Sequence, residues 1–435
     1  MPNIIVLGTF DTKGEQLLYI VNAIQQHKNM QVTVIDVGKT PILDPAIHVP
    51  SSLIAKYGSR NTPDIPDNDV GNLSRAELNK LMATGARTYV RSLFQQADTS
   101  PVHGMISLGG SFGTSLASSV MRLACPMGFP KLIVSTIASG DTGSIVGETD
   151  ITLMYSIVDV AGLNSLLRNI LDNAVGAIAG MATVYENSSL TLQKPINTAK
   201  KLVRVGITMF GVTTPCVDRI RAHLQSLSDR EDSTYTIEPF VFHATGHGGR
   251  AMEHLITAGG LDAIIDLTTT EIADYVVGGV MSAGPTRLDA AIAAGIPMVL
   301  SVGATDIVNF GPCHTVPERF AKRKLYEHNS QVTLLRSSPE ECTEIGRFIA
   351  EKLKSKGTRG LQSMVEVWLP KGGVSMISGR GEPFEDVKAD EALFNAVRCG
   401  LSGTGIKIVE SDCAINDEVF AVGVADALVK LLALD

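Results

Sequence analysis

Three glycine-rich loops contain the residues best suited to bind phosphate: Gly8–Gly14 (GTFDTKG), Leu108–Ser115 (LGGSFGTS) and Ala138–Gly143 (ASGDTG). Each loop follows an apolar run and precedes a helical pattern. The N-terminus of a helix presents unpaired N–H groups and a partial positive charge, which together favour an anion. The loops therefore predict a site for a phosphate-bearing ligand at one edge of a sheet.

The loop Leu108–Ser115 has the residue types of a phosphate cradle. Ser111 and Thr114 carry hydroxyl donors, and Gly110 and Gly113 are expected to adopt backbone conformations that residues with a Cβ avoid. The loop matches neither GxGxxG nor GxxxxGK[ST]. A tight strand-to-helix turn without a ligand is therefore the alternative interpretation.

The loop Gly8–Gly14 adds hydroxyls and charges to the predicted site. Thr9 and Thr12 are hydroxyl donors, and Lys13 can pair with phosphate, while Asp11 can orient Lys13 or hold a magnesium ion through water. In the alternative interpretation, the aspartate or a threonine caps a helix that runs from Glu15 to Gln26, and the lysine is solvated.

The second half of the chain contains a different set of polar residues. Arg250 can grip a carboxylate or phosphate with two hydrogen bonds, and His243 or Glu271 can exchange protons with a substrate. Together with Thr269 and Asp306, these residues form a candidate active site for a small carboxylate or carbonyl compound. The catalytic candidates are therefore His243, Arg250, Glu271 and Asp306.

A zinc site is not expected in the second half. His243 and His247 are four residues apart with Glu253 nearby, which on a helix would place both imidazoles on one face. The glycines at positions 246, 248 and 249 predict a loop instead, and no HExxH motif is present.

Apolar runs alternate with helical patterns along both halves of the chain, which is typical of parallel strands covered by helices on both faces. We therefore predict an α/β protein with two Rossmann-like three-layer subdomains, residues 1–200 and 201–435, whose sheets are mostly parallel. The polar segment Glu186–Lys201 marks the boundary. The predicted strands are Asn3–Leu7, Val32–Val37, Gly104–Leu108 and Leu132–Thr136 in the first half and Leu202–Met209, Thr236–Phe242, Ala263–Leu267, Pro297–Val302, Met364–Leu369 and Gly405–Glu410 in the second.

The two halves repeat one pattern of strands and loops, which suggests two copies of one topology. In this alignment, Gly8–Gly14 corresponds to Thr208–Thr214, Ser107–Ser115 to Asp266–Asp274, and Ser135–Gly143 to Ser301–Phe310.

Composition excludes several classes of partner. The net charge is −8 over 435 residues, so no basic surface for nucleic acid is expected. No apolar stretch approaches the roughly 18 uninterrupted residues of a membrane span. Six scattered cysteines without a CxxC pair suggest free thiols in a reducing compartment. We expect a cytoplasmic protein that binds neither nucleic acid nor membrane.

Seven motifs of this chain resemble the Tm-1-like ATP-binding domain family, which is named for a plant virus-resistance protein. The resemblance runs over essentially the whole chain. It rests on GTFDTKG at Gly8–Gly14, LGGSFGTSL at Leu108–Leu116, STIASGDTG at Ser135–Gly143, GITMFGVTTPCV at Gly206–Val217, FHATGHGGRAME at Phe242–Glu253, TTTEIADYVVGGV at Thr268–Val280 and SVGATDIVNFGP at Ser301–Pro312.

The resemblance implies two Rossmann-like subdomains, ATP binding in the first and a tendency to form homodimers. It places the nucleotide on Thr9, Asp11, Thr12, Lys13, Gly109, Gly110, Ser111, Gly113, Thr114, Ser139 and Gly140. The family does not come with an established reaction. Three hypotheses follow: an ATP-binding protein of uncharacterised cellular role, an enzyme of small-molecule metabolism whose active site lies in the second half or between the halves, and a non-catalytic protein-binding module that ATP stabilises.

Overall fold

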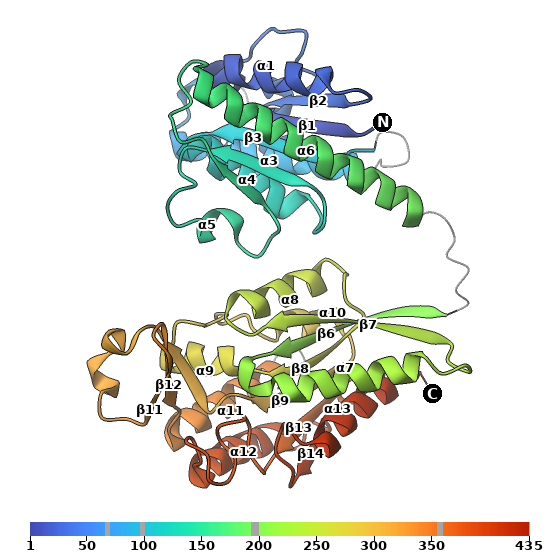
Figure 1. Cartoon of the computed structure of the whole chain (residues 1–435), viewed down its shortest axis with the longest axis vertical. Coiled ribbons are helices and arrows are strands. Elements are labelled where there is room, and N and C mark those ends of the chain that lie inside the picture. Colours follow the sequence, from blue (N-terminus) through green and yellow to red (C-terminus); the bar gives the residue numbers. More distant parts are fainter. Residues whose placement is uncertain (66–69, 96–100, 193–199, 355–359, 435) are drawn as a thin grey trace. The chain divides into compact units, whose positions relative to one another are not determined.

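A computed structural model describes residues 1–65, 70–95, 101–192, 200–354 and 360–434. The chain divides into two compact units, Met1–Ile196 and Asn197–Asp435, which we call the first and second units (Figure 1). Each unit is a parallel β-sheet with helices on both faces. The predicted fold class, α/β with two Rossmann-like three-layer subdomains, is confirmed.

The sheet of the first unit is entirely parallel and has the strand order β2-β1-β3-β4-β5. Its central strands β3 and β4 are fully buried, as expected for apolar runs that helices cover on both faces. The strands are β1 (Asn3–Gly8), β2 (Gln31–Asp36), β3 (Gly104–Gly109), β4 (Lys131–Ser135) and β5 (Thr152–Tyr155).

Two separate cores hold the helices of the first unit to its sheet. Helices α1 (Phe10–Gln26) and α6 (Ser165–Leu192) cover one face. Helices α2 (Ser51–Ser59), α3 (Arg75–Gln95) and α4 (Ser111–Ala124) cover the other. The short helices η1 (Val70–Asn72) and α5 (Gly143–Val146) lie in connecting segments.

The sheet of the second unit is also parallel, with the order β14-β13-β9-β8-β6-β7. Its strands are β6 (Lys201–Met209), β7 (Tyr235–His243), β8 (Ala263–Thr268), β9 (Met298–Gly303), β13 (Val365–Pro370) and β14 (Lys407–Ser411). One face is covered by α8 (His247–Thr257), α9 (Thr270–Val277), α10 (Asp289–Ala294), α11 (Pro339–Lys354) and α12 (Val387–Leu401), and the other by α7 (Thr214–Ser228) and α13 (Glu418–Leu431).

The loop segments that the sequence alignment paired lie at the ends of strands that occupy equivalent places in the two sheets. The order β2-β1-β3-β4 of the first unit corresponds to β7-β6-β8-β9 of the second. In each sheet, successive strands are added first toward one edge and then toward the other. The change occurs between the adjacent strands β1 and β3 in the first unit and β6 and β8 in the second. Ligands of open α/β sheets bind in the crevice at such a switch point.

A small antiparallel sheet in the second unit was not predicted. Its order is β10-β12-β11, formed by β10 (Ile307–Phe310), β11 (Leu325–Asn329) and β12 (Val332–Arg336). Beside it lie the 3₁₀ turns η3 (Cys313–Thr315) and η4 (Glu318–Phe320); two more turns, η2 (Gly211–Thr213) and η5 (Leu361–Ser363), occur elsewhere in this unit. The sequence between β9 and β13 was assigned no strand, because short strands carry only a weak pattern.

Two predicted loops are helical at their C-terminal ends. Helix α1 begins with a turn at Phe10, and a kink at Lys13 (φ −130°, ψ 23°) separates this turn from the helix that was predicted from Glu15. Helix α8 begins at His247, where the glycines predicted a loop. Gly249 lies inside α8, where the buried carboxylate of Glu271 packs against it. This position requires glycine, because a Cβ would lie 1.9 Å from Glu271 Oε2. The glycine therefore permits a close contact and does not break the helix.

A buried charge cluster links the elements of the second unit. The guanidinium of Arg287 is 1% exposed and donates to Asp266 at 2.7 Å and to Glu271 at 2.8 Å. Oε1 of Glu271 accepts hydrogen bonds from the amides of Gly246 (2.6 Å) and Gly249 (2.9 Å) at the start of α8. The cluster thus joins β8, α9 and α8.

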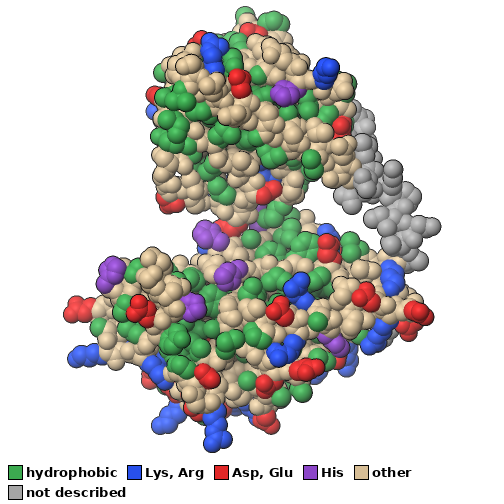
Figure 2. Space-filling view, viewed as in Figure 1, with side chains coloured by type: hydrophobic (Ala, Val, Ile, Leu, Met, Phe, Trp, Pro, Cys, Tyr) green, Lys and Arg blue, Asp and Glu red, His purple; other side chains and the backbone are tan. Residues whose placement is uncertain are grey.

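No helix among the described residues is long and apolar enough to cross a membrane. On the face shown in Figure 2, positive and negative side chains are interspersed over the second unit.

We expect Arg287→Leu to destabilise the second unit by about 3–5 kcal/mol, because it leaves buried carboxylates without their counter-ion. Arg204→Leu is the matched control: it removes a half-exposed ion pair with Asp262, which contributes about 1 kcal/mol or less. Trp368, the one tryptophan of the chain, lies in β13 and reports urea unfolding of this unit by fluorescence. Equal losses for the two variants would contradict the structural role of the cluster.

Candidate functional site

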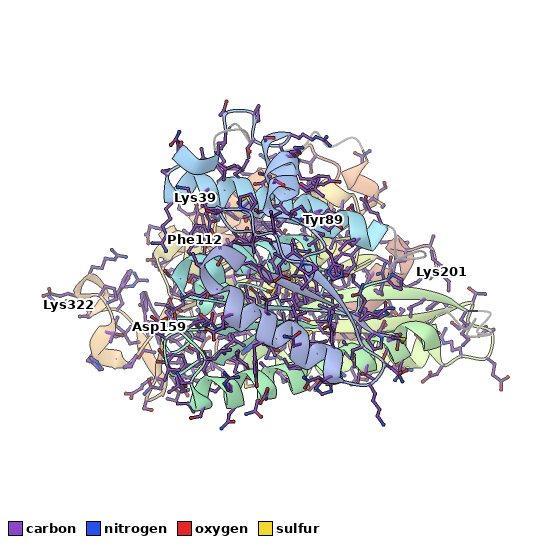
Figure 3. All side chains as sticks on the ribbon, turned by 90° about the horizontal axis from the view of Figure 1, so that it is seen from above. Lys39, Tyr89, Phe112, Asp159, Lys201 and Lys322 are labelled. Atoms are coloured by element: carbon purple, nitrogen blue, oxygen red, sulfur yellow. The ribbon has the colours of Figure 1, made fainter. Side chains whose placement is uncertain are left out.

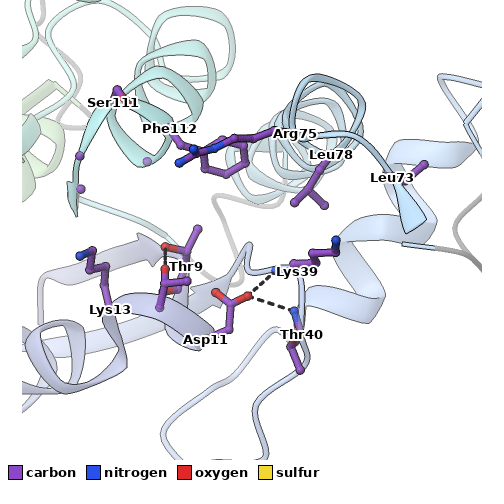
Figure 4. Close-up of a pocket in the computed structure, with 14 residues that line it drawn as sticks. Thr9, Asp11, Lys13, Lys39, Thr40, Leu73, Arg75, Leu78, Ser111 and Phe112 are labelled. Atoms are coloured by element: carbon purple, nitrogen blue, oxygen red, sulfur yellow. Dashed lines mark hydrogen bonds between the residues drawn. The ribbon is translucent and has the colours of Figure 1, made fainter. Parts of the chain in front are cut away.

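A cavity of ≈ 560 Å³ lies at the switch point of the first unit, beyond the carboxyl ends of β1 and β3 (Figure 4). Its volume falls within the roughly 300–1,000 Å³ of small-molecule sites. The residues that line it are Thr9, Asp11, Thr12, Lys13, Lys39, Thr40, Leu73, Arg75, Leu78, Gly109, Gly110, Ser111, Phe112 and Gly113.

The N-terminus of α4 forms one wall of this cavity. Gly110 is its N-cap residue and no side chain caps the helix. The first intrahelical bond runs from the amide of Thr114 to the carbonyl of Gly110, at 2.9 Å. The amides of the first helical residues, Ser111, Phe112 and Gly113, therefore lack a partner within the helix and can receive an anion.

The glycines of this turn act differently from the prediction. Gly110 has φ −81° and ψ −159°, and Gly113 also lies outside the left-handed region, so the expected special conformations were wrong. Gly109 is the position that requires glycine, because a Cβ there would lie 2.9 Å from the Cα of Gly113. The turn brings α4 directly against the end of β3.

The polar residues of the first loop line the cavity but bond mainly to the protein. The hydroxyls of Thr9 and Thr12 are 2.8 Å apart. Oδ2 of Asp11 accepts hydrogen bonds from the amides of Lys39 (2.8 Å) and Thr40 (3.1 Å). Asp11 thereby fastens the segment after β2 against the start of α1.

Lys13 lies at the glycine end of the cavity (Figure 4). Its ammonium group donates to the carbonyl of Val160. Its pairing with phosphate stays a prediction.

Three predicted nucleotide residues lie outside the residues that line the cavity. Thr114 is fully buried, and its hydroxyl is 2.7 Å from that of Ser135, so it ties α4 to β4. Ser139 and Gly140 are exposed in the turn after β4. The structure brings the first two loops together at the cavity, and the third loop does not line it.

Six lining residues were absent from the predicted set: Lys39, Thr40, Leu73, Arg75, Leu78 and Phe112. Phe112 lies inside the glycine-rich loop Leu108–Ser115, and the other five come from segments outside the three predicted loops. Lys39 and Phe112 lie at the same end of the first unit (Figure 3). The sequence Ser74-x-x-Glu77 is a capping box, which predicts that a helix begins at Arg75. This signal could have placed Arg75 at the start of α3.

The lining of the cavity contains both cationic and apolar side chains. Three cations, Lys13, Lys39 and Arg75, line it together with one carboxylate, Asp11, which is already held by two amides. Leu73 and Leu78 provide the apolar side chains at the opposite end from Lys13 (Figure 4). This arrangement suits a ligand with several negative charges and one apolar group.

The candidates on the surface of the second unit lie at the end of β7 and the start of α8. His243 is exposed, and its ring lies 5.6 Å from that of Phe210. Arg250 donates to the carbonyl of Ser282 at 3.0 Å and lies 3.0 Å from Nδ1 of His247.

The other candidates of the second unit are buried. Glu271 belongs to the Arg287 cluster, and Thr269 donates to the carbonyl of Ser301 at 3.0 Å. Asp306 accepts a hydrogen bond from the Ser375 hydroxyl at 2.7 Å, and burial raises the pKa of Asp306. Within the described part of the chain, no group of three or more His, Cys, Asp or Glu side chains is arranged to hold a metal ion.

Comparison with known proteins identifies relatives of the whole chain. Residues 2–187 match the N-terminal domain and residues 202–432 the C-terminal domain of the uncharacterised protein family UPF0261. A UPF0261 protein of Clostridium tetani is 42% identical over 99% of this chain and 98% of its own length. The ToMV resistance protein Tm-1(GCR237) of Solanum lycopersicum is 37% identical over 99% of this chain, which spans 56% of the tomato protein.

Two solved UDP-GlcNAc 2-epimerase structures are more distant. The enzyme of Methanocaldococcus jannaschii is 9% identical, covers 69% of this chain and 83% of its own, and has a TM-score of 0.19. The enzyme of Neisseria meningitidis is 10% identical, covers 100% of this chain and 99% of its own, and has a TM-score of 0.21. Scores this low carry no inference about ligand or reaction.

We expect Gly109→Ala to destabilise the first unit by about 1–3 kcal/mol, because the added methyl group meets the backbone of α4. Gly110→Ala is the control, since its Cβ meets only the Thr136 hydroxyl at 3.6 Å. Hydrogen exchange of β1 and β3 peptides, measured by mass spectrometry, reports the opening of this unit. Equal protection in the two variants would contradict the close approach at Gly109.

Proposed function

Because this chain belongs to the uncharacterised protein family UPF0261, we propose a function from its cavity: the first unit binds ATP, with the phosphates at the N-terminus of α4. The observation that carries this proposal is the uncapped first turn of α4, which lines a cavity at the switch point of a parallel sheet. Backbone N–H groups in this setting are a recurrent phosphate site.

The charge and shape of the cavity support a nucleotide over a simple anion. Three cationic side chains line it, which suits a chain of phosphates. Leu73 and Leu78 lie at the far end from Lys13 and provide apolar surface for a base (Figure 4). The resemblance of the motifs to the Tm-1-like ATP-binding domain family favours ATP among nucleotides.

The role of Asp11 in holding a magnesium ion through water stays a prediction. Its Oδ2 accepts two amide hydrogen bonds, and its Oδ1 is buried without a partner among the described atoms. Oδ1 is therefore the oxygen that would accept a hydrogen bond from a magnesium-bound water. Through Oδ2, Asp11 also keeps Lys39 and Thr40 at the cavity wall.

The other expectations for this chain stay predictions. They are the homodimer, the second small-molecule ligand on the second unit, and the cytoplasmic location.

We expect Gly110→Val to weaken ATP binding at least about tenfold, because its side chain would occupy the space in front of the α4 amides. The fold should persist, since a Cβ at Gly110 makes only an ordinary contact. Isothermal titration calorimetry with ATP measures the affinity, and circular dichroism checks the fold.

Gly140→Val is the matched control for this experiment. Gly140 is exposed in the third predicted loop, does not line the cavity, and would place its Cβ 3.9 Å from the nearest carbonyl. It should bind ATP like the wild type. Unchanged ATP affinity in Gly110→Val, or equal losses in both variants, would refute the proposed position of the phosphates.

A further inference from the structure

The cavity contains an arginine that comes from neither glycine-rich loop. Arg75 is the first residue of α3, and its side chain lies over the ring of Phe112, with the guanidinium carbon 5.5 Å from the ring centroid (Figure 4). Phe112 is the second residue of α4. The guanidinium is therefore held next to the helical turn whose amides face the cavity.

A capping box fixes the point from which Arg75 extends. The amide of Ser74 donates to Oε2 of Glu77 at 2.9 Å, and the amide of Glu77 donates to the Ser74 hydroxyl at 3.3 Å. These reciprocal bonds define the start of α3. They also engage the Glu77 carboxylate with its own helix, where hydrogen bonds from Ser74 lower the pKa of Glu77.

The charge of Arg75 is not neutralised by a carboxylate of the described residues, and its ring contact uses none of its N–H groups in an N–H···O bond. A cation–π contact at an exposed site is weak. Hydrogen bonds from a guanidinium to an anion are stronger, and two can form in parallel. A phosphate group within reach would therefore engage this guanidinium.

The other cations of the cavity are less suited to this role. The ammonium group of Lys13 already donates to the carbonyl of Val160. Lys39 is a single point charge on the wall formed by the segment after β2. A planar guanidinium can instead bond two phosphate oxygens at once.

One helix N-terminus supplies about half a positive charge and a few amides. Most of the negative charge of a di- or triphosphate is therefore left for side-chain cations to balance. We infer that Arg75 binds the outer phosphates of the nucleotide and makes the cavity select nucleoside di- and triphosphates over monophosphates. This inference rests on the proposed nucleotide site.

The test compares the affinities of ATP, ADP and AMP for the wild type and for Arg75→Gln, by isothermal titration calorimetry on the full chain. We expect Arg75→Gln to weaken ATP and ADP about tenfold and AMP less than about twofold, so that the ratio of ATP to AMP affinity falls. Arg75→Lys should recover only part of the loss, because an ammonium cannot form the paired hydrogen bonds.

Lys80→Gln is the matched control, since Lys80 is an exposed cation of the same helix that does not line the cavity. It should leave all three affinities unchanged. Circular dichroism melts verify that each variant folds.

The possible outcomes separate this inference from the proposed function. If the wild type binds ATP but Arg75→Gln keeps the same ratio of ATP to AMP affinity, the role of Arg75 is overturned and the nucleotide site stands. An equal loss of affinity for all three nucleotides also overturns the role of Arg75, because Arg75 would then contact a part of the nucleotide that ATP, ADP and AMP share. If the wild type binds none of them, the proposed function itself fails.

Discussion

The cavity depends on one constraint, the reversal of strand order between β1 and β3. These neighbouring strands are followed by helices on opposite faces of the sheet, α1 on one and α4 on the other. The two helices therefore diverge beyond the strand ends and leave a space that no side chain of the sheet fills. This space leaves the amides at the N-terminus of α4 accessible to a ligand and lets side chains of α3 line the cavity.

The second unit repeats this topology, but several polar groups at its strand ends and helix starts are hydrogen-bonded within the protein. The amides at the start of α8 are bound by Glu271, and the amide of Cys216 in α7 donates to Oδ1 of Asn416 at 3.2 Å. At the switch point itself, the hydroxyls of Thr213 and Thr268 are 2.8 Å apart. Buried polar groups that satisfy one another rigidify a fold and present few free donors to a ligand.

Acidic residues in the first unit hold the walls of the cavity in place. Oδ1 of Asp36 accepts hydrogen bonds from the amides of Phe10 (3.2 Å) and Gly38 (2.8 Å), while Asp11 holds the two amides that follow. Burial raises the pKa of Asp36. The motif GTFDTKG thus combines residues that face the cavity with a carboxylate that shapes it, a distinction that a list of residue types does not make.

The sequence by itself determined the alternation of strands and helices, the repeated pattern of the two halves and the glycine-rich turns after β1 and β3, because buried parallel strands and strand-to-helix turns restrict local residue choice. Only the tertiary structure decided which loops share a cavity. Ser139 and Gly140 have suitable chemistry but lie apart from it, while Arg75 and Lys39 line it although each is distant in sequence from both glycine-rich turns. The small antiparallel sheet and the burial of Glu271 were likewise hidden, since pairing between distant segments leaves no local pattern.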